Sequence, residues 1–176
     1  LTRWLSPILS FTAEEIWQFI PGKKDESVFL TTWYDGWPVV ESVDMAVWQQ
    51  LQVVRDEVNK ALELERQQGH IGSALAANVQ LYAQDKLLLA LQSLGSELQF
   101  LLITSGATVH DFRDAPTEIL RNSELNLAIR VESNLFEKCA RCWHRCEDVG
   151  NNLEHPELCS RCVGNISGHS ESRCHV

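Results

Sequence analysis

Two short stretches, residues 139–142 (CARC) and 159–162 (CSRC), decide how the last part of this chain must fold. Two residues separate the cysteines within each stretch, and sixteen residues separate the stretches. A pair with this spacing forms a tight turn, so both of its thiolates can face one ion. Four soft sulfur ligands suit tetrahedral Zn²⁺, and the pattern predicts one structural zinc site. The predicted ligands are Cys139, Cys142, Cys159 and Cys162.

A pair of disulfides is the main alternative, because the chain holds six cysteines. Disulfides persist in oxidising compartments, and we see no charged-then-apolar signal segment that would direct the chain to one. The sequon at 165–167 is then expected to be a chance match. Cys146, His144 or His155 could replace one ligand, and Cys174 is left over, but two symmetric pairs already complete a closed site. A closed site leaves no position for an activated water, so the metal is expected to build the fold.

The composition is that of a globular chain, with 176 residues, 44% hydrophobic content and a net charge of −9. No apolar run approaches the roughly 20 residues that span a bilayer, so we expect no membrane partner and a cytoplasmic location. The acidic balance argues against a general nucleic-acid binder. Residues 1–132 hold 10 basic and 18 acidic side chains, whereas residues 133–176 hold 5 and 6, with four of the six histidines. A polyanion is therefore expected to contact the cysteine-rich end.

Three segments of different character are predicted, and together they make an α+β chain. Residues 1–40 are helical and aromatic, residues 41–132 form a small α+β domain, and residues 133–176 form the zinc-binding module. The chain begins at Leu1, without methionine, so we expect it to be a piece of a longer protein.

Helix signals dominate the first segment. Pro7 interrupts a short first helix, and residues 12–15 (TAEE) read as a capping box that starts a second helix. That helix is expected to end at Pro21-Gly22 and to carry Ile16, Phe19 and Ile20 on one face. A segment this short cannot bury its apolar side chains alone, so it must pack on other sequence.

Alternating and helical periods organise the middle segment. A helix is predicted over residues 42–68, with Gly69 just past its end. The other predicted elements are a strand over 79–83, a helix capped by Asp85 that runs to Leu94, a hairpin of 100–104 and 107–112 around Ser105-Gly106, and a strand over 125–131. The segment has no glycine-rich phosphate loop and no acid–base cluster, so no active site is predicted in it.

Residues 70–73 (HIGS) resemble the start of the HIGH signature that binds ATP phosphates in class I aminoacyl-tRNA synthetases. That signature follows the first strand of a nucleotide-binding fold and works with a distant KMSKS loop. Here the stretch follows a long helix, its last histidine is replaced by Ser73, and no KMSKS occurs. We interpret the two glycines as helix punctuation and Ser73 as a possible helix cap.

Several stretches, in order along the chain, resemble isoleucyl-tRNA synthetases of the bacterial type. Residues 5–17 (LSPILSFTAEEIW) look like the end of the helical anticodon-binding domain of the isoleucine, valine and leucine group of class I synthetases. Residues 54–62 (VRDEVNKAL) and 69–83 are similar to the following junction domain, and CARCWH with CSRC is similar to the terminal zinc module. Valyl enzymes usually end in a coiled coil, which is not seen here.

The resemblance implies a role in holding the tRNA anticodon stem-loop with one structural Zn²⁺, as part of a monomeric ligase whose absent catalytic domain uses ATP. Unpaired bases are recognised by stacking on aromatic rings and by arginine donors. Trp143 directly follows a predicted ligand and matches the position of an anticodon-contacting tryptophan in the family. Packing on the zinc core is the other role open to it. Arg141, Arg145 and Arg161 are the predicted basic neighbours in the tRNA-binding surface.

Two other functions fit parts of the pattern. Formamidopyrimidine-type DNA glycosylases end in the same cysteine spacing, but they need basic surroundings and an N-terminal proline nucleophile. The acidic body and the match at residues 12–17 count against that class and against DNA as a partner. A zinc-stabilised protein-interaction module is the remaining alternative. Binding to tRNA or to duplex DNA would separate these hypotheses.

Overall fold

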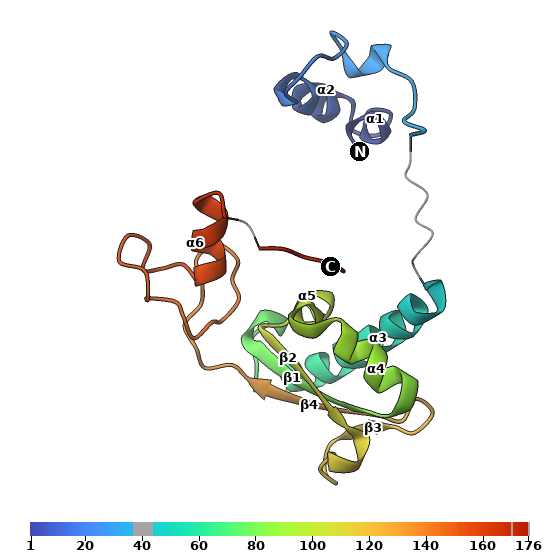
Figure 1. Cartoon of the computed structure of the whole chain (residues 1–176), viewed down its shortest axis with the longest axis vertical. Coiled ribbons are helices and arrows are strands. Elements are labelled where there is room, and N and C mark those ends of the chain that lie inside the picture. The colour runs from blue at the N-terminus through green and yellow to red at the C-terminus, as the bar shows by residue number, and fades with distance from the viewer. Residues whose placement is uncertain (37–43, 170, 176) are drawn as a thin grey trace. The chain divides into compact units, whose positions relative to one another are not determined.

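The computed structural model describes residues 1–36, 44–169 and 171–175. The chain divides into two compact units, Leu1–Val43 and Asp44–Val176. The prediction of a mixed chain of helices and strands is confirmed, with a four-stranded sheet in the second unit (Figure 1). The predicted domain boundaries near residues 40 and 132 remain predictions. Within the second unit we call residues 44–134 the sheet domain, residues 135–169 the zinc module and residues 171–175 the C-terminal tail.

The first unit is a pair of helices and one short turn around a small core. Helix α1 is Thr2–Leu5, α2 is Ser10–Phe19 and the 3₁₀ turn η1 is Val28–Leu30. Helix α1 ends at Leu5, before Pro7, as predicted. Proline has no backbone N–H to donate to the preceding helical turn, so the helix does not continue through it. Ala13, Trp17 and Val28 are buried together, and the Trp17 indole N–H donates to the Asp25 carbonyl at 2.9 Å.

The predicted capping box at residues 12–15 is wrong. Helix α2 begins at Ser10, two residues earlier, so Thr12 lies inside it. The reason is that Leu9, whose backbone is non-helical, holds the cap position, and its carbonyl accepts from the Ala13 N–H, so the first turn of α2 has already formed at Thr12. The predicted apolar face is also only partly buried, since Phe19 is 82% exposed and Ile16 is 41% exposed.

The long helix of the second unit is confirmed. Helix α3 covers Met45–Gln67, and the Asp44 side chain accepts hydrogen bonds from the Ala46 and Val47 N–H groups at its start. Residues 42–43 of the prediction lie outside the described residues. Gly69 follows the helix with a φ of +79°, the left-handed geometry that glycine supplies at this position. The buried side of α3 is formed by Leu51, Val54, Val58, Ala61 and Leu62.

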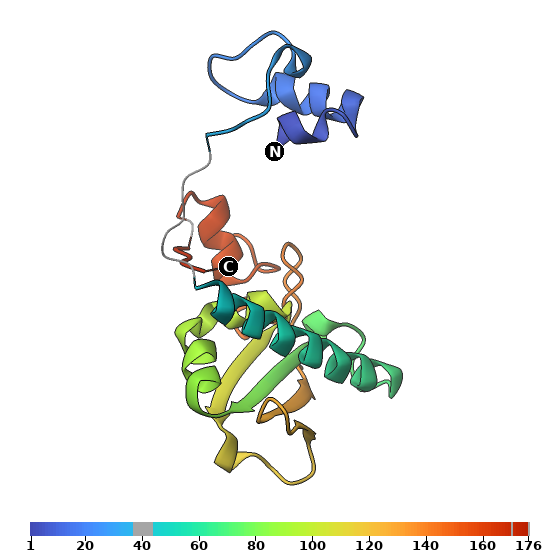
Figure 2. The same ribbon diagram turned by 90° about the vertical axis from the view of Figure 1, so that its right-hand side faces the viewer.

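The sheet has the strand order β2-β1-β4-β3. Its strands are β1 (Ala77–Ala83), β2 (Gly106–Asp111), β3 (Leu120–Asn122) and β4 (Leu127–Ser133). Strand β1 runs parallel to β2 and antiparallel to β4, which pairs antiparallel with β3. Alternate residues of β1 and β4, such as Val79, Leu81 and Ile129, share one core with the apolar sides of α3, α4 and α5. The three helices therefore cover the same face of the sheet (Figures 1 and 2). Strands β1 and β4 confirm two predicted strands.

The predicted hairpin at 100–112 is wrong in its first half. Residues 98–102 form α5 (Leu98–Leu102), which ends at Ile103 with a φ of +56°. Strand β2 then enters parallel to β1, and a parallel pair needs a crossover. Helix α4 (Asp85–Ser93), the 3₁₀ turn η3 (Gly95–Glu97) and α5 supply that crossover. The short apolar run at 100–104 fits helix and strand alike, so the crossover decides its conformation.

Two smaller predictions on caps are also corrected. Asp85 does not cap α4: Gln84 holds the cap position, and Asp85 is the first helical residue, with a φ of +53°. Ser73 precedes the 3₁₀ turn η2 (Ala74–Ala76), but its side chain makes no capping hydrogen bond. Residues 70–73, which resemble a phosphate-binding signature, lie just after the end of α3. His70 contacts Glu65 at 2.6 Å and Ile71 is buried in the core.

The remaining elements are η4 (Phe112–Asp114), between β2 and β3, and α6 (Ser160–Ile166), in the zinc module. Within the described residues, no helix has the length and apolar character needed to cross a membrane.

Candidate metal centre

The first cysteine pair lies in a tight turn that is closed by backbone hydrogen bonds. The Cys139 N–H donates to the His144 carbonyl at 2.9 Å, and the Trp143 N–H donates to the Cys139 carbonyl at 3.0 Å. An isolated antiparallel bridge joins Lys138 to Arg145 at the base of the turn. The turn holds the two ends of the stretch together, so both sulfurs can reach one point.

The second pair is positioned by a helix. Cys159 is the N-cap residue of α6, and Cys162 lies in the first turn of that helix. Side chains three residues apart share one helix face, so this pair also converges. The Ala140 N–H donates to the Glu157 carbonyl at 3.0 Å, which holds the two turns against each other.

The four predicted ligands come together. Their sulfur atoms all lie within 4.8 Å of one another, and Cys142 Sγ is 3.7 Å from Cys159 Sγ. A regular tetrahedron with Zn–S bonds of about 2.3 Å places its sulfurs about 3.8 Å apart. All six cysteines are free, and a sulfur separation of 3.7 Å is far from a disulfide bond. The donor set and its spacing therefore fit a single zinc ion.

Burial and local donors act oppositely on these thiols. Burial disfavours the Cys139 thiolate, but backbone N–H groups of Cys142, Cys159 and Arg141 outweigh it and lower the Cys139 pKa to about 6. Burial raises the pKa of Cys159 and also that of Cys162. A bound Zn²⁺ would supply the positive charge that holds all four sulfurs as thiolates.

The three side chains considered as substitute ligands lie outside this group. Cys146 packs half-buried against the cluster, and burial raises the pKa of its thiol. Burial also lowers the pKa of His144, whose Nδ1 lies 3.2 Å from the Cys142 carbonyl oxygen. Among the described residues, the metal-binding group contains only the four predicted cysteines, and His155 is not part of it.

Trp143 is the most unusual residue of the centre. Its backbone has a φ of +67°, in the left-handed region that bulky side chains rarely adopt. Its side chain is 59% exposed, and the Lys138 ammonium lies 4.9 Å from the ring centroid. Strained backbone kept at an exposed aromatic residue points to a use for that residue.

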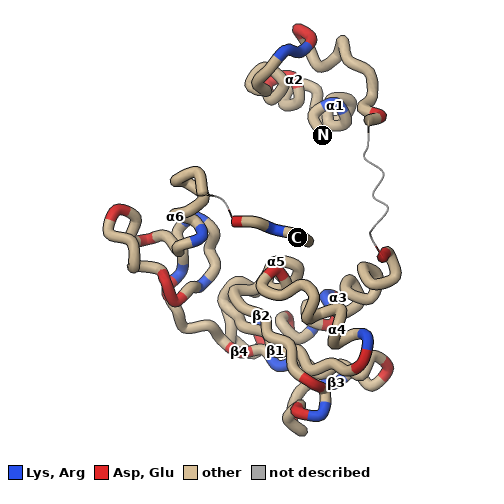
Figure 3. Tube along the Cα trace, in the orientation of Figure 1, with Lys and Arg blue, Asp and Glu red and all other residues tan. Residues whose placement is uncertain are grey.

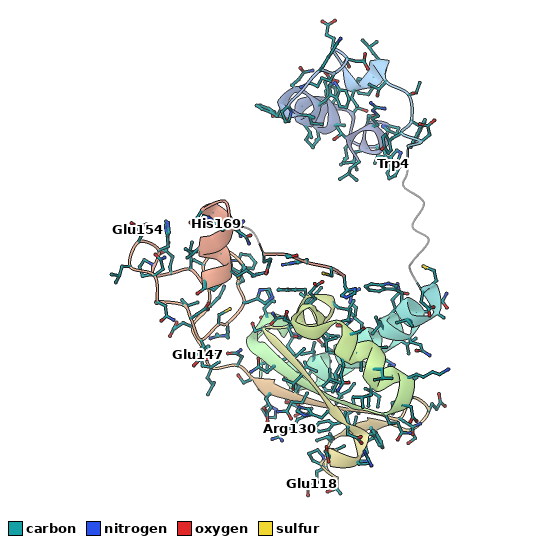
Figure 4. The ribbon with its side chains drawn as sticks, viewed as in Figure 1. Trp4, Glu118, Arg130, Glu147, Glu154 and His169 are labelled. Carbon is teal, nitrogen blue, oxygen red and sulfur yellow. The ribbon has the colours of Figure 1, made fainter. Side chains whose placement is uncertain are left out.

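The three predicted arginines have different surroundings. Arg141 is exposed, and one guanidinium nitrogen lies 3.5 Å from Cys162 Sγ. Arg145 is half-buried and donates to the Phe136 carbonyl at 2.8 Å. Arg161 lies 3.4 Å from the Glu171 carboxylate. Figure 3 shows basic positions beside α6 and acidic positions on the outer loops of the zinc module, where Glu147 and Glu154 are marked in Figure 4.

Three residues that touch the zinc module were not predicted from the sequence. Phe100, Ser105 and Asn134 contact it from the sheet domain through rings and hydrogen bonds. Asn134 is only 5% exposed although its side chain is polar. Its position directly after a strand is the only sequence signal that could have pointed to any of the three. No spacing rule marks such residues, because they are brought together by the fold.

Comparison with known families identifies both ends of the chain. The family described as "Anticodon-binding domain of tRNA ligase" matches residues 1–81. The family described as "Zinc finger found in FPG and IleRS" matches residues 136–164. The second description covers both classes of protein that share the cysteine spacing, so the zinc finger alone does not separate them.

Whole-chain similarity separates the two classes. The chain is 58% identical over 175 residues to an isoleucine–tRNA ligase of Legionella pneumophila (strain Paris), and 49% identical over 176 residues to one of Psychromonas ingrahamii. It is 49% identical over 173 residues to one of Coxiella burnetii (strain Dugway 5J108-111). These matches cover 97–99% of this chain but only 18–19% of the relatives. Together with the two family matches, they show that the chain is similar over nearly its whole length to isoleucine–tRNA ligases, of whose length it spans about a fifth.

Proposed function

We propose that this chain is the C-terminal, tRNA-binding part of an isoleucine–tRNA ligase, the enzyme that uses ATP to attach isoleucine to its tRNA. The observation that carries the proposal is the similarity to such ligases over 99% of the chain. The match of residues 1–81 to an anticodon-binding domain supports a role of this part in holding the anticodon stem-loop. The catalytic and editing domains are proposed to lie elsewhere in the parent enzyme, so this part alone is expected to be inactive.

Zinc is proposed to build the binding surface. Cys139, Cys142, Cys159 and Cys162 would all serve as ligands, which leaves no coordination position for a substrate or a water. The ion would fix the turn that carries Trp143, and it would take no part in the chemistry of aminoacylation.

Trp143 is the proposed base-stacking platform. An exposed indole that neither coordinates zinc nor packs into the core can offer the ring face that Lys138 does not cover to an unpaired base. Arg141 is the proposed phosphate contact, because it is exposed beside the same turn. Arg145 and Arg161 are already held by protein groups, and we propose that they add positive charge to the surface. We further propose a monomeric, cytoplasmic protein with neither DNA nor membrane partners.

The test is binding of the full 176-residue chain to the isoleucine tRNA and to duplex DNA at one fixed salt concentration. Trp143→Ala is expected to cost about 1–3 kcal/mol of tRNA binding, the size of one base–aromatic stack. Zinc content should not change, because the indole is not a ligand. Leu153→Ala, at a 97% exposed apolar position of the same module, is the matched control. Preference for duplex DNA, or equal tRNA binding by Trp143→Ala and the parent, would contradict the proposal.

A further inference from the structure

Backbone polar groups of Arg145 help to tie the zinc module to the sheet domain. The Arg145 N–H donates to Ser105 Oγ at 2.7 Å, and the Arg145 carbonyl accepts from Asn134 Nδ2 at 3.2 Å. Ser105 in turn donates to the Leu75 carbonyl, between α3 and β1. Both backbone polar groups of Arg145 are thus held by side chains of the sheet domain, and Arg145 lies only two residues after Trp143.

The absence of a side chain at Gly106, which pairs with Asn78, leaves space beside these hydrogen bonds. Asn134 Nδ2 also donates to Asn78 Oδ1 at 2.9 Å, at the edge where β1 meets β2. A Cβ atom added to Gly106 would lie 2.6 Å from that same Oδ1. Glycine at this position therefore leaves room for the Asn78–Asn134 pair.

Phe100 provides the apolar half of the contact. It is on α5 but outside the apolar core that the rest of that helix helps to form. The His144 ring meets it edge-on, with 5.7 Å between centroids, and the Arg161 guanidinium lies 4.8 Å from its ring. The Arg173 guanidinium of the C-terminal tail lies 4.0 Å from the same ring. Phe100 is thus a ring of the sheet domain that receives groups from the module and from the tail.

The tail returns to the same helix end. Glu97 is 9% exposed, and its carboxylate accepts from the Cys174 and His175 N–H groups at 2.6 and 2.7 Å. Burying a carboxylate is unfavourable unless donors compensate, and these two donors come from the tail. Figure 1 shows the tail running from α6 back toward α5.

In the sequence, Trp143 lies between a predicted zinc ligand and two residues that contact the sheet domain. Cys142 precedes it in the predicted zinc site, while His144 and Arg145 follow it against Phe100, Ser105 and Asn134. We propose that Phe100, Ser105 and Asn134 form a docking site that positions Trp143 for tRNA, an inference that rests on the proposed function. In this assignment they are positioning residues, which contact the module and not the RNA.

One experiment tests the docking itself. In the full chain, Co²⁺ replaces the zinc, and pseudocontact shifts are measured on backbone amides of β1 and α3. A docked module gives sizeable pseudocontact shifts on the amides of this strand and this helix. Phe100→Ala, Ser105→Ala and Gly106→Ala are each expected to shrink the shifts by about half or more, because the module then reorients. Phe100→Tyr keeps the ring and should restore them, and Leu153→Ala should leave them unchanged. Parent-like shifts in all three disrupting variants would overturn the docking site.

A second experiment tests positioning. Phe100→Ala should weaken tRNA binding about fivefold in the parent background but less than about twofold in a Trp143→Ala background, since residues that act through one another are not additive. One equivalent of zinc should be retained throughout. Equal losses in both backgrounds would overturn positioning through Trp143. Parent-like tRNA binding by Trp143→Ala would refute the proposed tRNA contact and its positioning together, whereas the cobalt experiment would still decide whether the docking site exists.

Discussion

The sheet domain and the zinc module are neighbours in one unit, yet they are stabilised by different physics. The sheet domain buries sixteen hydrophobic residues in one cluster, including Leu81, Leu91 and Leu102. The core of the zinc module contains three buried cysteines and Leu158. Apolar burial can stabilise the first region alone, whereas the second has too little apolar surface for that and is expected to depend on a bound metal. The zinc module should therefore be sensitive to loss of the metal, and the sheet domain to loss of buried apolar side chains.

Removal of zinc should have the largest effect, and only on the module. Chelation, or Cys159→Ser, should unfold residues 135–169, because metal binding and folding are one equilibrium in such a module, with apparent zinc affinities of about 10–16 kcal/mol. The sheet domain should keep its fold. Amide spectra of the full chain, recorded with and without chelator, measure both regions at once. Cys146→Ser is the control and should retain zinc. A Cys159→Ser protein with full zinc and an ordered module would refute the ligand assignment.

A cavity in the sheet core should produce the reverse pattern. Leu81→Ala removes a side chain with no exposed surface and should cost about 2–5 kcal/mol of unfolding free energy. Denaturant titration measures the loss, and zinc content should stay near one equivalent at low denaturant. Leu89→Ala is the control: it truncates the same type of side chain at a position that is 67% exposed, and it should cost far less unfolding free energy. Equal losses from the two variants would show that the core assignment is wrong.

The two regions also differ in how well the sequence predicts them. The convergence of the four cysteines can be predicted from the sequence because metal coordination demands fixed residue types at fixed spacings. Strands β1 and β4 and helix α3 follow from alternation and from helical periodicity. Residues 98–102 are misassigned because a short apolar run satisfies both periods, and the parallel pairing with β1 is not visible locally. Phe100 and Ser105 acquire their contacts only through the fold, so no local signal identifies them.

The backbone of Trp143 offers a smaller effect, inside the zinc module. A left-handed conformation costs an ordinary residue about 1–2 kcal/mol, and glycine avoids that cost. Trp143→Gly should therefore give a more stable module than Trp143→Ala, by about 1 kcal/mol. Both variants should lose the same tRNA affinity, because both lack the indole. The comparison is made by following zinc-module amides in denaturant. Equal stabilities would show that the backbone conformation carries no strain.

The smallest expected effect concerns the unit Leu1–Val43, which has no large core among its described residues 1–36 and no predicted metal. Its turn at Val28 is held by Glu14, whose carboxylate accepts from Ser27 Oγ at 2.8 Å and from the Val28 N–H at 3.0 Å. The hydrogen bond from Ser27 is the main reason that the Glu14 pKa lies below its ordinary value. A lowered pKa means that this contribution is fully present above the ordinary value and is lost as the pH falls through the lowered one.

Hydrogen exchange at the Val28 amide should therefore become faster on acidification in the parent, after correction for the intrinsic rate. Glu14→Gln removes the titrating group and should flatten that dependence. The neighbouring Glu15→Gln, at a position that makes no contact with Val28 among the described hydrogen bonds, should keep the parent profile. The zinc module should respond to acid by losing its metal, because protonated thiols do not bind it, and the two acid responses can be read separately in one titration. A parent-like pH profile in Glu14→Gln would show that burial of Trp17 and Val28, and not the carboxylate, holds this turn.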